Sequence, residues 1–466
     1  MFDASVYAGR RERLRSLLAA SGSSEGLALF LGNRPSPMNY EDNCHRFRQD
    51  SSFLYFFGIA LPDLAATMDL ASGRATLFID PPAADDVVWT GPRPGADELA
   101  AAAGVARAQG RGRLAAEARA ASKLLYLPPY RAETRHELAE LDGRPASEIA
   151  QRASLPLIRA CVALRQIKSD AEIEEMERAV AVSVRMHEAA IDGARPGMRE
   201  YEVAALMAQA AHSAGCQPAF PIIATTRGET LHNLEDRRLL ERGGLFLVDA
   251  GAETAEGYDG DISSTFPIGG RFEGRQRDVY LLTCAAHRAA AACVSPGRPF
   301  RDAHFAACRT IFEGMKDLGV ARGDVEEALA AGAHALFFPC GTGHQIGMDP
   351  HDMESYGEIW VGYDGQAKSS QFGLKSLRMS KPLAPGMVVT IEPGIYFIPA
   401  LVERWKADPA LASFVDFAAL EPFMAVGGAR NEEDWLVTGT GGRPLGPAFD
   451  KSVGAIEARR ARALGG

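Results

Sequence analysis

The 466-residue sequence predicts two folding units of different classes, an α/β unit followed by an α+β unit built on a curved antiparallel sheet. Length is the first observation, because a chain this long exceeds what one ordinary hydrophobic core can serve. The second is a change of texture: after Pro221, strands, helices and strands follow one another in blocks. We expect an N-terminal domain of residues 1–158 and a C-terminal domain of residues 159–466.

The N-terminal domain is predicted from short apolar runs separated by Ala-rich stretches of helical character. The runs have the length of buried strands, and the alternation with helices is typical of an α/β unit. The predicted strands are Leu27–Leu31, Ala75–Ile79 and Leu124–Leu127.

The C-terminal domain begins with a helix signal. Ser169 and Glu172 have the spacing of a capping box, in which the serine caps the helix and the glutamate reaches back. Ile173, Met176 and Val180 then follow at helical spacing, which predicts a long amphipathic helix. Farther along, we expect strands at Gly244–Gly251, Tyr258–Phe266, Val388–Ile391 and Glu433–Val437, with helices at Gln276–Cys293 and Asp302–Leu318.

Composition narrows the class of protein. Apolar residues make up 47% and charged residues 24%, as in soluble globular chains. The net charge of -10 argues against nucleic acid and anionic membranes as partners. The sequence has no apolar stretch long enough for a membrane span, its start lacks a signal-peptide core, and its seven cysteines form no CxxC pair. We therefore expect a cytoplasmic protein with reduced thiols.

Acidic residues stand at the ends of several apolar runs, where a lone charge is costly to bury. In LFLVDAGAETAEGYDGDISSTFP, Asp249 ends such a run, and the chain returns through Asp259 and Asp261. Residues two apart on a strand share a face, so either aspartate could meet Asp249 across a hairpin. The alternative is a hairpin with solvated acids in its turn.

Three later segments add further candidates. PCGTGHQIGMDPHDME contains His344 and His351, although a lone histidine is more often structural than a ligand. Glu392 closes the apolar run of PGMVVTIEPGIYF. In ARNEEDWLVT, Arg430 and Glu432 lie two apart and so on one face of a strand.

Together these segments supply four carboxylates, one of which is either Asp259 or Asp261, and the imidazole of His344. Bare carboxylates would repel one another, and two divalent cations would neutralise them. Hard oxygen ligands suit Mn²⁺, and one histidine also fits Zn²⁺ or Co²⁺. Two such metal ions can share a hydroxide and clamp a carbonyl oxygen, which predicts a hydrolase.

The phrases VDAG, GDIS, GTGHQIG, TIEPGIY and NEED, in this order, resemble the ligand phrases of the pita-bread metallopeptidases. FRQDSSFLYFFGI and VVWTGPRPG resemble the N-terminal domain of aminopeptidase P, and LRQIKSDAEIEEMERA resembles the entry helix of the catalytic domain. The resemblance covers nearly the whole chain and points to the proline-specific branch, aminopeptidase P and prolidase. It implies a pita-bread catalytic domain after an aminopeptidase P-like α/β domain.

The resemblance also implies roles for individual residues. It selects Asp261 over Asp259, and it implies bridging by Asp261 and Glu432. Glu392 resembles the general base, and His232 in TTRGETLHN resembles a histidine that contacts the scissile carbonyl or the leaving nitrogen. The implied metal ligands are Asp249, Asp261, His344, Glu392 and Glu432, and the other implied catalytic residues are His351, Tyr396 and Arg430.

The substrate length follows from a further likeness. Arg378 lies in a segment that resembles the prolidase segment supplying an arginine for the substrate's free carboxylate, although it could be a surface arginine on a loop. Glu392 and Glu432 are 40 residues apart, a long separation that also looks like prolidase. We therefore expect an Xaa-Pro dipeptidase, with an Xaa-Pro aminopeptidase acting on longer peptides as the alternative. A metal-free creatinase-like enzyme or a noncatalytic peptide-binding protein is the third possibility.

A few positions depart from the family or concern assembly. Cys340 stands where the family has a substrate-contacting histidine, and Asn431 replaces a usual apolar residue.

Trp89 matches a position that approaches a neighbouring subunit's pocket, and the family implies a homodimer. The remaining histidines are expected to be structural or exposed: His45, His136, His187, His212, His287, His304 and His334.

Overall fold

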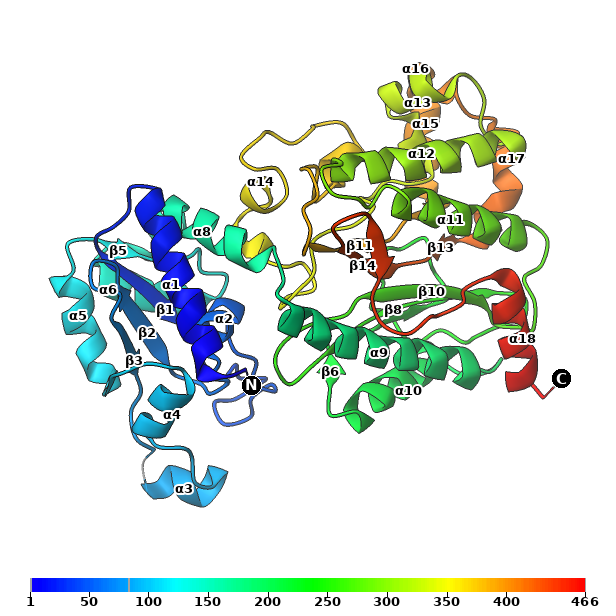
Figure 1. Cartoon of the computed structure of the whole chain (residues 1–466). Helices are drawn as coiled ribbons and strands as arrows, with labels where there is room; N and C mark the ends of the chain where they lie inside the picture. Colours follow the sequence, from blue (N-terminus) through cyan, green and yellow to red (C-terminus); the bar gives the residue numbers. More distant parts are fainter. Residues whose placement is uncertain (1, 83, 466) are drawn as a thin grey trace. The chain divides into compact units, whose positions relative to one another are not determined.

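The computed structural model describes residues 2–82 and 84–465, which form an N-terminal and a C-terminal unit (Figure 1). The N-terminal unit contains the chain up to Arg165 and the later segment Met353–Trp360, and the C-terminal unit contains the rest. The predicted boundary between residues 158 and 159 lies inside helix α8 (Leu155–Arg165).

The N-terminal unit is built on a five-stranded mixed sheet in the order β4-β3-β2-β1-β5. The central strand pairs are antiparallel, and the outer pairs β3–β4 and β1–β5 are parallel. The strands are β1 (Leu27–Leu31), β2 (Ala65–Asp69), β3 (Ala75–Phe78), β4 (Ala108–Gln109) and β5 (Leu124–Leu125). The helices are α1 (Ala4–Ala20), α2 (Ser51–Phe57), α3 (Ala84–Thr90), α4 (Ala96–Ala102), α5 (Leu114–Ala120), α6 (Ala132–Asp142), α7 (Ala146–Ile149) and α8.

The C-terminal unit contains small sheets whose described strand pairs are antiparallel. Two of the sheets have three strands each, in the orders β10-β8-β7 and β11-β14-β15. The strands are β6 (Gln217–Pro218), β7 (Ile223–Thr225), β8 (Leu245–Ala250), β9 (Ala252–Glu253), β10 (Ile262–Pro267), β11 (Val388–Ile391), β12 (Gly394–Tyr396), β13 (Gly428–Arg430), β14 (Glu433–Val437) and β15 (Gly442–Pro444).

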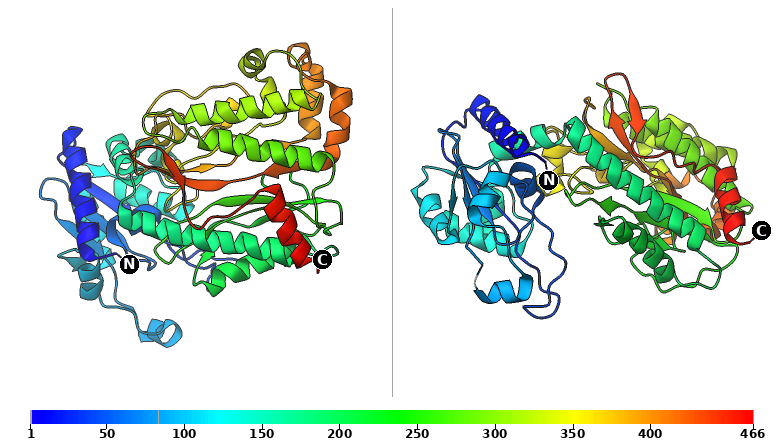
Figure 2. Two further views of the ribbon diagram at one scale, coloured as in Figure 1. Left: turned by 45° about the vertical axis from the view of Figure 1, so that its right-hand side comes forward. Right: turned by 60° about the horizontal axis from the view of Figure 1, so that its bottom comes forward.

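Helices cover these sheets from two sides. Helices α9 and α10 pack against each other, and α9 runs along β8 and β10, as Figure 2 shows from two further angles. Helices α11 and α12 form a second pair, and α11 contacts β11, β12 and β13. The helices are α9 (Asp170–Gly193), α10 (Glu200–Ser213), α11 (Arg275–Ala291), α12 (Phe300–Asp317), α13 (Val325–Ala331), α15 (Pro399–Ala407), α16 (Pro409–Ala412), α17 (Phe417–Leu420) and α18 (Val453–Ala463). The short helix α14 (Glu358–Val361) begins in the segment that belongs to the N-terminal unit.

Local sequence explains where the elements of the site begin. The capping box at the start of α9 is present, because the Ser169 N–H donates to Glu172 Oε2 at 3.0 Å. Strand β10 begins four residues later than predicted. The backbones of Gly251 and Gly260 touch ahead of it, so closely that a Cβ on Gly251 would lie 1.6 Å from the Gly260 carbonyl oxygen. Asp261 is therefore held just outside the strand, at the point of this close approach.

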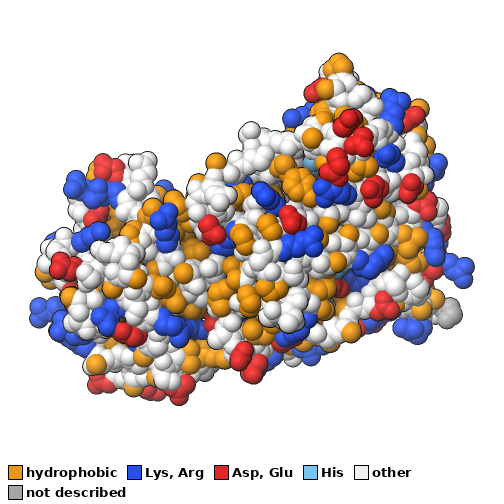
Figure 3. Space-filling model, turned by 45° about the horizontal axis from the view of Figure 1, so that its top comes forward, with side chains coloured by type: hydrophobic (Ala, Val, Ile, Leu, Met, Phe, Trp, Pro, Cys, Tyr) orange, Lys and Arg blue, Asp and Glu red, His pale blue; other side chains and the backbone are white. Residues whose placement is uncertain are grey.

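The surface carries charges of both signs. On the face drawn in Figure 3, acidic and basic side chains are interspersed. Within residues 2–82 and 84–465, no helix is long and apolar enough to cross a membrane.

Candidate metal centre

The five predicted ligands come from different elements of the C-terminal unit. Asp249 lies in β8, whose register pairs it with Ser263 of β10. Glu392 directly follows β11, whereas Glu432 lies between β13 and β14 rather than inside a strand as predicted. His344 lies on a loop fixed to β11, since its N–H donates to the Thr390 hydroxyl at 3.1 Å. The ends of several strands therefore meet around one loop.

The His344 ring is oriented toward the carboxylates. Its Nδ1 bonds the Gln345 carbonyl oxygen at 3.1 Å, which leaves Nε2 as the free ligand nitrogen. Nε2 lies 3.7 Å from Asp261 Oδ2 and 3.5 Å from Glu392 Oε1. One ligand atom each from Asp261, His344 and Glu432 lies within 4.8 Å of the others. These side chains could hold a metal ion together.

Asp249 joins this group through Arg430. Arg430 Nη2 donates to Asp249 Oδ2 at 2.6 Å, and its Nε donates to the Ser263 hydroxyl at 2.8 Å. The Ser263 hydroxyl donates in turn to Glu432 Oε2 at 2.7 Å. The third guanidinium nitrogen, Nη1, donates to the Tyr396 hydroxyl at 3.0 Å. One arginine thus orients two carboxylates and a tyrosine.

A single guanidinium does not balance four carboxylates. Burial and the Glu432 charge raise the pKa of Asp261 and of Glu392 well above their usual values. Burial and the Asp249 charge raise the pKa of Glu432 to about 7. Among the described residues, Asp249 Oδ1 and Asp261 Oδ1 are buried and accept no hydrogen bond. An oxygen-rich set with unpaired acceptors and one imidazole fits hard divalent cations.

Asp259, the alternative to Asp261, has a different setting. Its backbone N–H donates to the Gly347 carbonyl oxygen at 2.8 Å. Its backbone also forms an isolated antiparallel β-bridge with that of Glu253. Asp259 does not belong to the group formed by Asp261, His344 and Glu432.

Three residues that hydrogen-bond to the proposed ligands were not predicted from the sequence. Ser263 links Arg430 to Glu432, and its position directly after GDI was the available signal. Asp434 accepts from the Asp261 N–H at 2.9 Å. Lys451 Nζ donates to the Glu432 carbonyl oxygen at 2.6 Å, and nothing in the surrounding tail of the sequence indicates this role.

The predicted substrate-side residues His351, His232 and Arg378 interact with this group in different ways. The His351 ring stacks on His344, with ring centroids 3.8 Å apart. Burial and Arg430 lower the pKa of His232, and Arg378 contributes to this effect. Arg378 is half-buried, and its charge also opposes the raised pKa of Glu392. The charge of Arg378 therefore interacts electrostatically with His232 and Glu392.

Two unusual residues lie beside the group. Burial and the Glu392 charge raise the pKa of the Cys340 thiol to about 12. Asn431 Nδ2 donates to Cys284 Sγ at 3.2 Å, so its side chain contacts α11.

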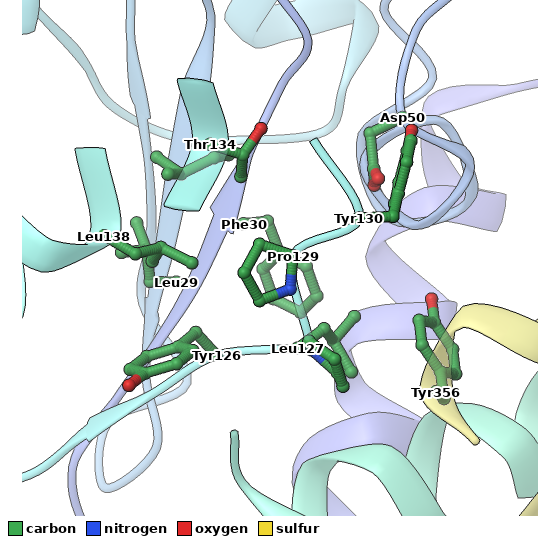
Figure 4. Close-up of a pocket in the computed structure, with 12 residues that line it drawn as sticks. Leu29, Phe30, Asp50, Tyr126, Leu127, Pro129, Tyr130, Thr134, Leu138 and Tyr356 are labelled. Atoms are coloured by element: carbon green, nitrogen blue, oxygen red, sulfur yellow. The ribbon is translucent and has the colours of Figure 1, made fainter. Parts of the chain in front are cut away.

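The N-terminal unit contributes a different kind of surface. Trp89 of α3 has a side chain that is 85% exposed, next to Val88 at 77%. A pocket in this unit is lined by apolar and aromatic side chains that include Phe30, Pro129 and Tyr356 (Figure 4). None of the predicted site residues lines that pocket.

The remaining histidines divide by burial. His187, His304 and His334 are buried, His287 is half-buried, and His45, His136 and His212 are exposed.

Comparison with known proteins gives a consistent result. Residues 174–439 match the model of metallopeptidase family M24, and residues 7–123 match that of the aminopeptidase P N-terminal domain. A protein named Probable Xaa-Pro aminopeptidase PEPP, from Ajellomyces dermatitidis, is 31% identical over 454 residues, 92% of each chain. The Xaa-Pro dipeptidase of Homo sapiens is 30% identical over 442 residues, 92% of this chain and 87% of that one.

Solved structures agree with these relatives. The structure of Pseudomonas aeruginosa aminopeptidase PepP is similar over 100% of both chains, with a TM-score of 0.82 and 29% identity. The predicted fold class and the predicted family resemblance are both confirmed.

Proposed function

The chain belongs to metallopeptidase family M24, and we propose that it hydrolyses Xaa-Pro dipeptides at the bond before proline. The observation that carries this proposal is the gathering of Asp261, Glu392 and Glu432 around His344. Asp249, the fourth carboxylate, is joined to them through Arg430. The names of its relatives, which include a dipeptidase and an aminopeptidase, support cleavage next to proline.

We propose that the site holds two divalent cations, Mn²⁺ in the first place, with Zn²⁺ or Co²⁺ as substitutes. Asp249, Asp261, His344, Glu392 and Glu432 would hold the two ions. Their unpaired buried oxygens and the imidazole Nε2 support this assignment. Bound there, the cations would polarise the scissile carbonyl and lower the pKa of a water molecule.

The chain's own groups then move the protons and position the substrate. Glu392 takes the proton of the attacking water as general base. Arg430 keeps Asp249 and Glu432 in position, the latter through the Ser263 hydroxyl. Tyr396, held by its hydrogen bond from Arg430, closes the pocket.

Recognition of the substrate falls to residues around this group. His232 contacts the scissile carbonyl or the leaving nitrogen, and His351, whose ring stacks on His344, lies near the substrate. Arg378 pairs with the free carboxylate of the dipeptide, where a guanidinium can bind both oxygens at once. Cys340 lies against the substrate in place of the family's histidine, and its thiol is a poorer hydrogen-bond donor.

Cleavage of longer peptides by an Xaa-Pro aminopeptidase is the second candidate, favoured by the name of the Ajellomyces relative. It differs in one requirement, because a longer peptide presents no carboxylate directly after proline for Arg378 to bind.

The test compares an Xaa-Pro dipeptide with the matching Xaa-Pro-Xaa tripeptide before and after metal removal by a chelator. We expect rapid dipeptide cleavage that is lost with the chelator and recovered with Mn²⁺. Rapid cleavage of the tripeptide alone would favour the aminopeptidase. Cleavage of neither peptide by the Mn²⁺-loaded chain would contradict the proposed function.

We further propose a homodimer in the cytoplasm, with residues 1–158 and 159–466 as its domains. The exposed Trp89 and Val88 of α3 support an association surface. All seven cysteines, which lie within the described residues, are free thiols, and this supports a reducing compartment. Sedimentation of wild type and Trp89→Ala tests the assembly, with a shift of the variant toward monomer expected.

A further inference from the structure

Three metal-ligand side chains meet in the interior of the C-terminal unit, apart from the carboxylate group. His304 and Cys308 lie four residues apart on α12 and therefore share one face of that helix. His334 approaches from the 3₁₀ turn Ala333–Leu336. One ligand atom from each residue lies within 4.8 Å of the others, and all three side chains are buried.

The first pair already has the separation that a metal ion requires. His304 Nε2 and Cys308 Sγ are 3.4 Å apart. Zinc bonds of about 2.0 Å to nitrogen and 2.3 Å to sulfur, at a tetrahedral angle, place such ligands about 3.5 Å apart. The other ring nitrogen of His304, Nδ1, bonds the Thr342 hydroxyl at 3.0 Å. A hydrogen bond of this kind fixes the ring and directs Nε2 to a metal.

His334 supplies a second, independent observation. Its side chain is 1% exposed, and neither ring nitrogen has a hydrogen-bond partner among the described residues. A buried imidazole normally finds such a partner, because burial removes it from water.

We propose that His304, Cys308 and His334 form a second metal site, for a cation of the Zn²⁺ class. Two imidazoles and a thiolate suit a borderline cation, whereas the carboxylate site suits hard Mn²⁺. The bound cation joins α12 to the turn Ala333–Leu336, and its ligand His304 bonds Thr342, two residues before His344. The site is separate from the proposed peptidase chemistry and does not depend on it.

The test loads the metal-free full-length chain with Co²⁺ and records the near-ultraviolet absorption of a thiolate–Co²⁺ bond. The proposed catalytic ligands contain no thiolate, so this absorption reports the second site. We expect it in the wild type and in the control Cys293→Ser, which removes another buried cysteine. Cys308→Ser and His334→Leu should lose the absorption and bind one fewer Co²⁺ per chain.

Two results would overturn the proposal: no thiolate absorption in the wild type at saturating Co²⁺, or an unchanged absorption in Cys308→Ser. If Cys308→Ser does not fold, His334→Leu decides in the same way, because it replaces an unpartnered imidazole by an apolar side chain. Peptide cleavage does not enter this readout, so failure of the proposed function leaves the test intact.

Discussion

Glu392 has a role that a single atom exchange can test. Glu392→Gln keeps the shape of the side chain but removes the carboxylate that we propose accepts the proton of the attacking water. We expect kcat on an Xaa-Pro dipeptide to fall by about 100-fold to 10,000-fold, the usual contribution of a general base. Circular dichroism should show an unchanged fold.

The matched control is Glu241→Gln, which alters an exposed glutamate of the same unit and should leave kcat unchanged. Wild-type turnover in the Glu392→Gln enzyme would remove Glu392 as the base.

Arg378 is the residue that we propose gives the chain its preference for dipeptides. Arg378→Ala should lower kcat/KM for an Xaa-Pro dipeptide by roughly tenfold or more, as expected for the loss of a charge-assisted hydrogen bond. The tripeptide, whose carboxylate lies one residue farther away, should be affected much less. Lys375→Ala, an exposed neighbour, serves as control. Equal losses on both peptides would argue that Arg378 does not read the substrate carboxylate.

The proposed metal ligands could be predicted from the sequence, but the residues that hold these ligands by hydrogen bonds, such as Ser263 and Lys451, could not. Asp249, Glu392 and His344 were noticed because each breaks an apolar or glycine-rich phrase. Spacing alone left Asp259 and Asp261 equivalent, since residues two apart share a strand face. Ser263 and Lys451 act through hydrogen bonds across 167 and 19 residues, and such tertiary contacts leave no local pattern.

Helix α9 packs against β8 and β10, the strands next to Asp249 and Asp261, so the stability of its first turn can be tested. Ser169→Ala removes the capping residue and should lower the free energy of unfolding by about 1 kcal/mol. Urea unfolding of the two proteins measures this difference. Ser213→Ala, at the exposed end of α10, is the control and should have little effect. A Ser169→Ala protein as stable as the wild type would show that the cap contributes nothing.

Elements followed the sequence where apolar runs have clear ends. Strands β1, β11 and β14 have the predicted bounds. The prediction was wrong where glycines and tertiary contacts intervene. Strand β10 starts late because of the contact between Gly251 and Gly260, and the interruption between β13 and β14 leaves Glu432 outside both. Both deviations occur at proposed ligands, where regular pairing gives way to the geometry of the site.

For the whole molecule, buried histidines make stability depend on pH. Burial lowers the pKa of His187 and of His304 from an ordinary 6.5 to about 3. Between these values the unfolded chain binds protons that the folded chain does not. Stability therefore falls as the pH drops from about 6.5 toward 3, by up to about 1.4 kcal/mol per pH unit for each histidine.

Urea unfolding between pH 7 and pH 5 checks this dependence. His187→Gln should give a shallower slope than the wild type, whereas His212→Gln, at an exposed position, should keep the wild-type slope. The same slope in all three proteins would contradict the assignment.

The organisation of the whole chain was predictable only in part. Length and texture indicated two units, but the segment Met353–Trp360 returns to the N-terminal unit from far along the chain. There the Tyr356 hydroxyl accepts from Arg165 Nη1 at 3.1 Å, a contact that spans 191 residues. No periodicity in the sequence predicts that a segment so far along the chain belongs to the N-terminal unit.

We propose that the carboxylate group holds two metal ions. Elemental analysis of the chain after saturation with Mn²⁺ and removal of free metal tests it most directly. Measuring Cys308→Ser beside the wild type excludes any contribution from the second proposed site. We predict two Mn²⁺ per chain in both proteins, and a chain that retains no Mn²⁺ would contradict the account.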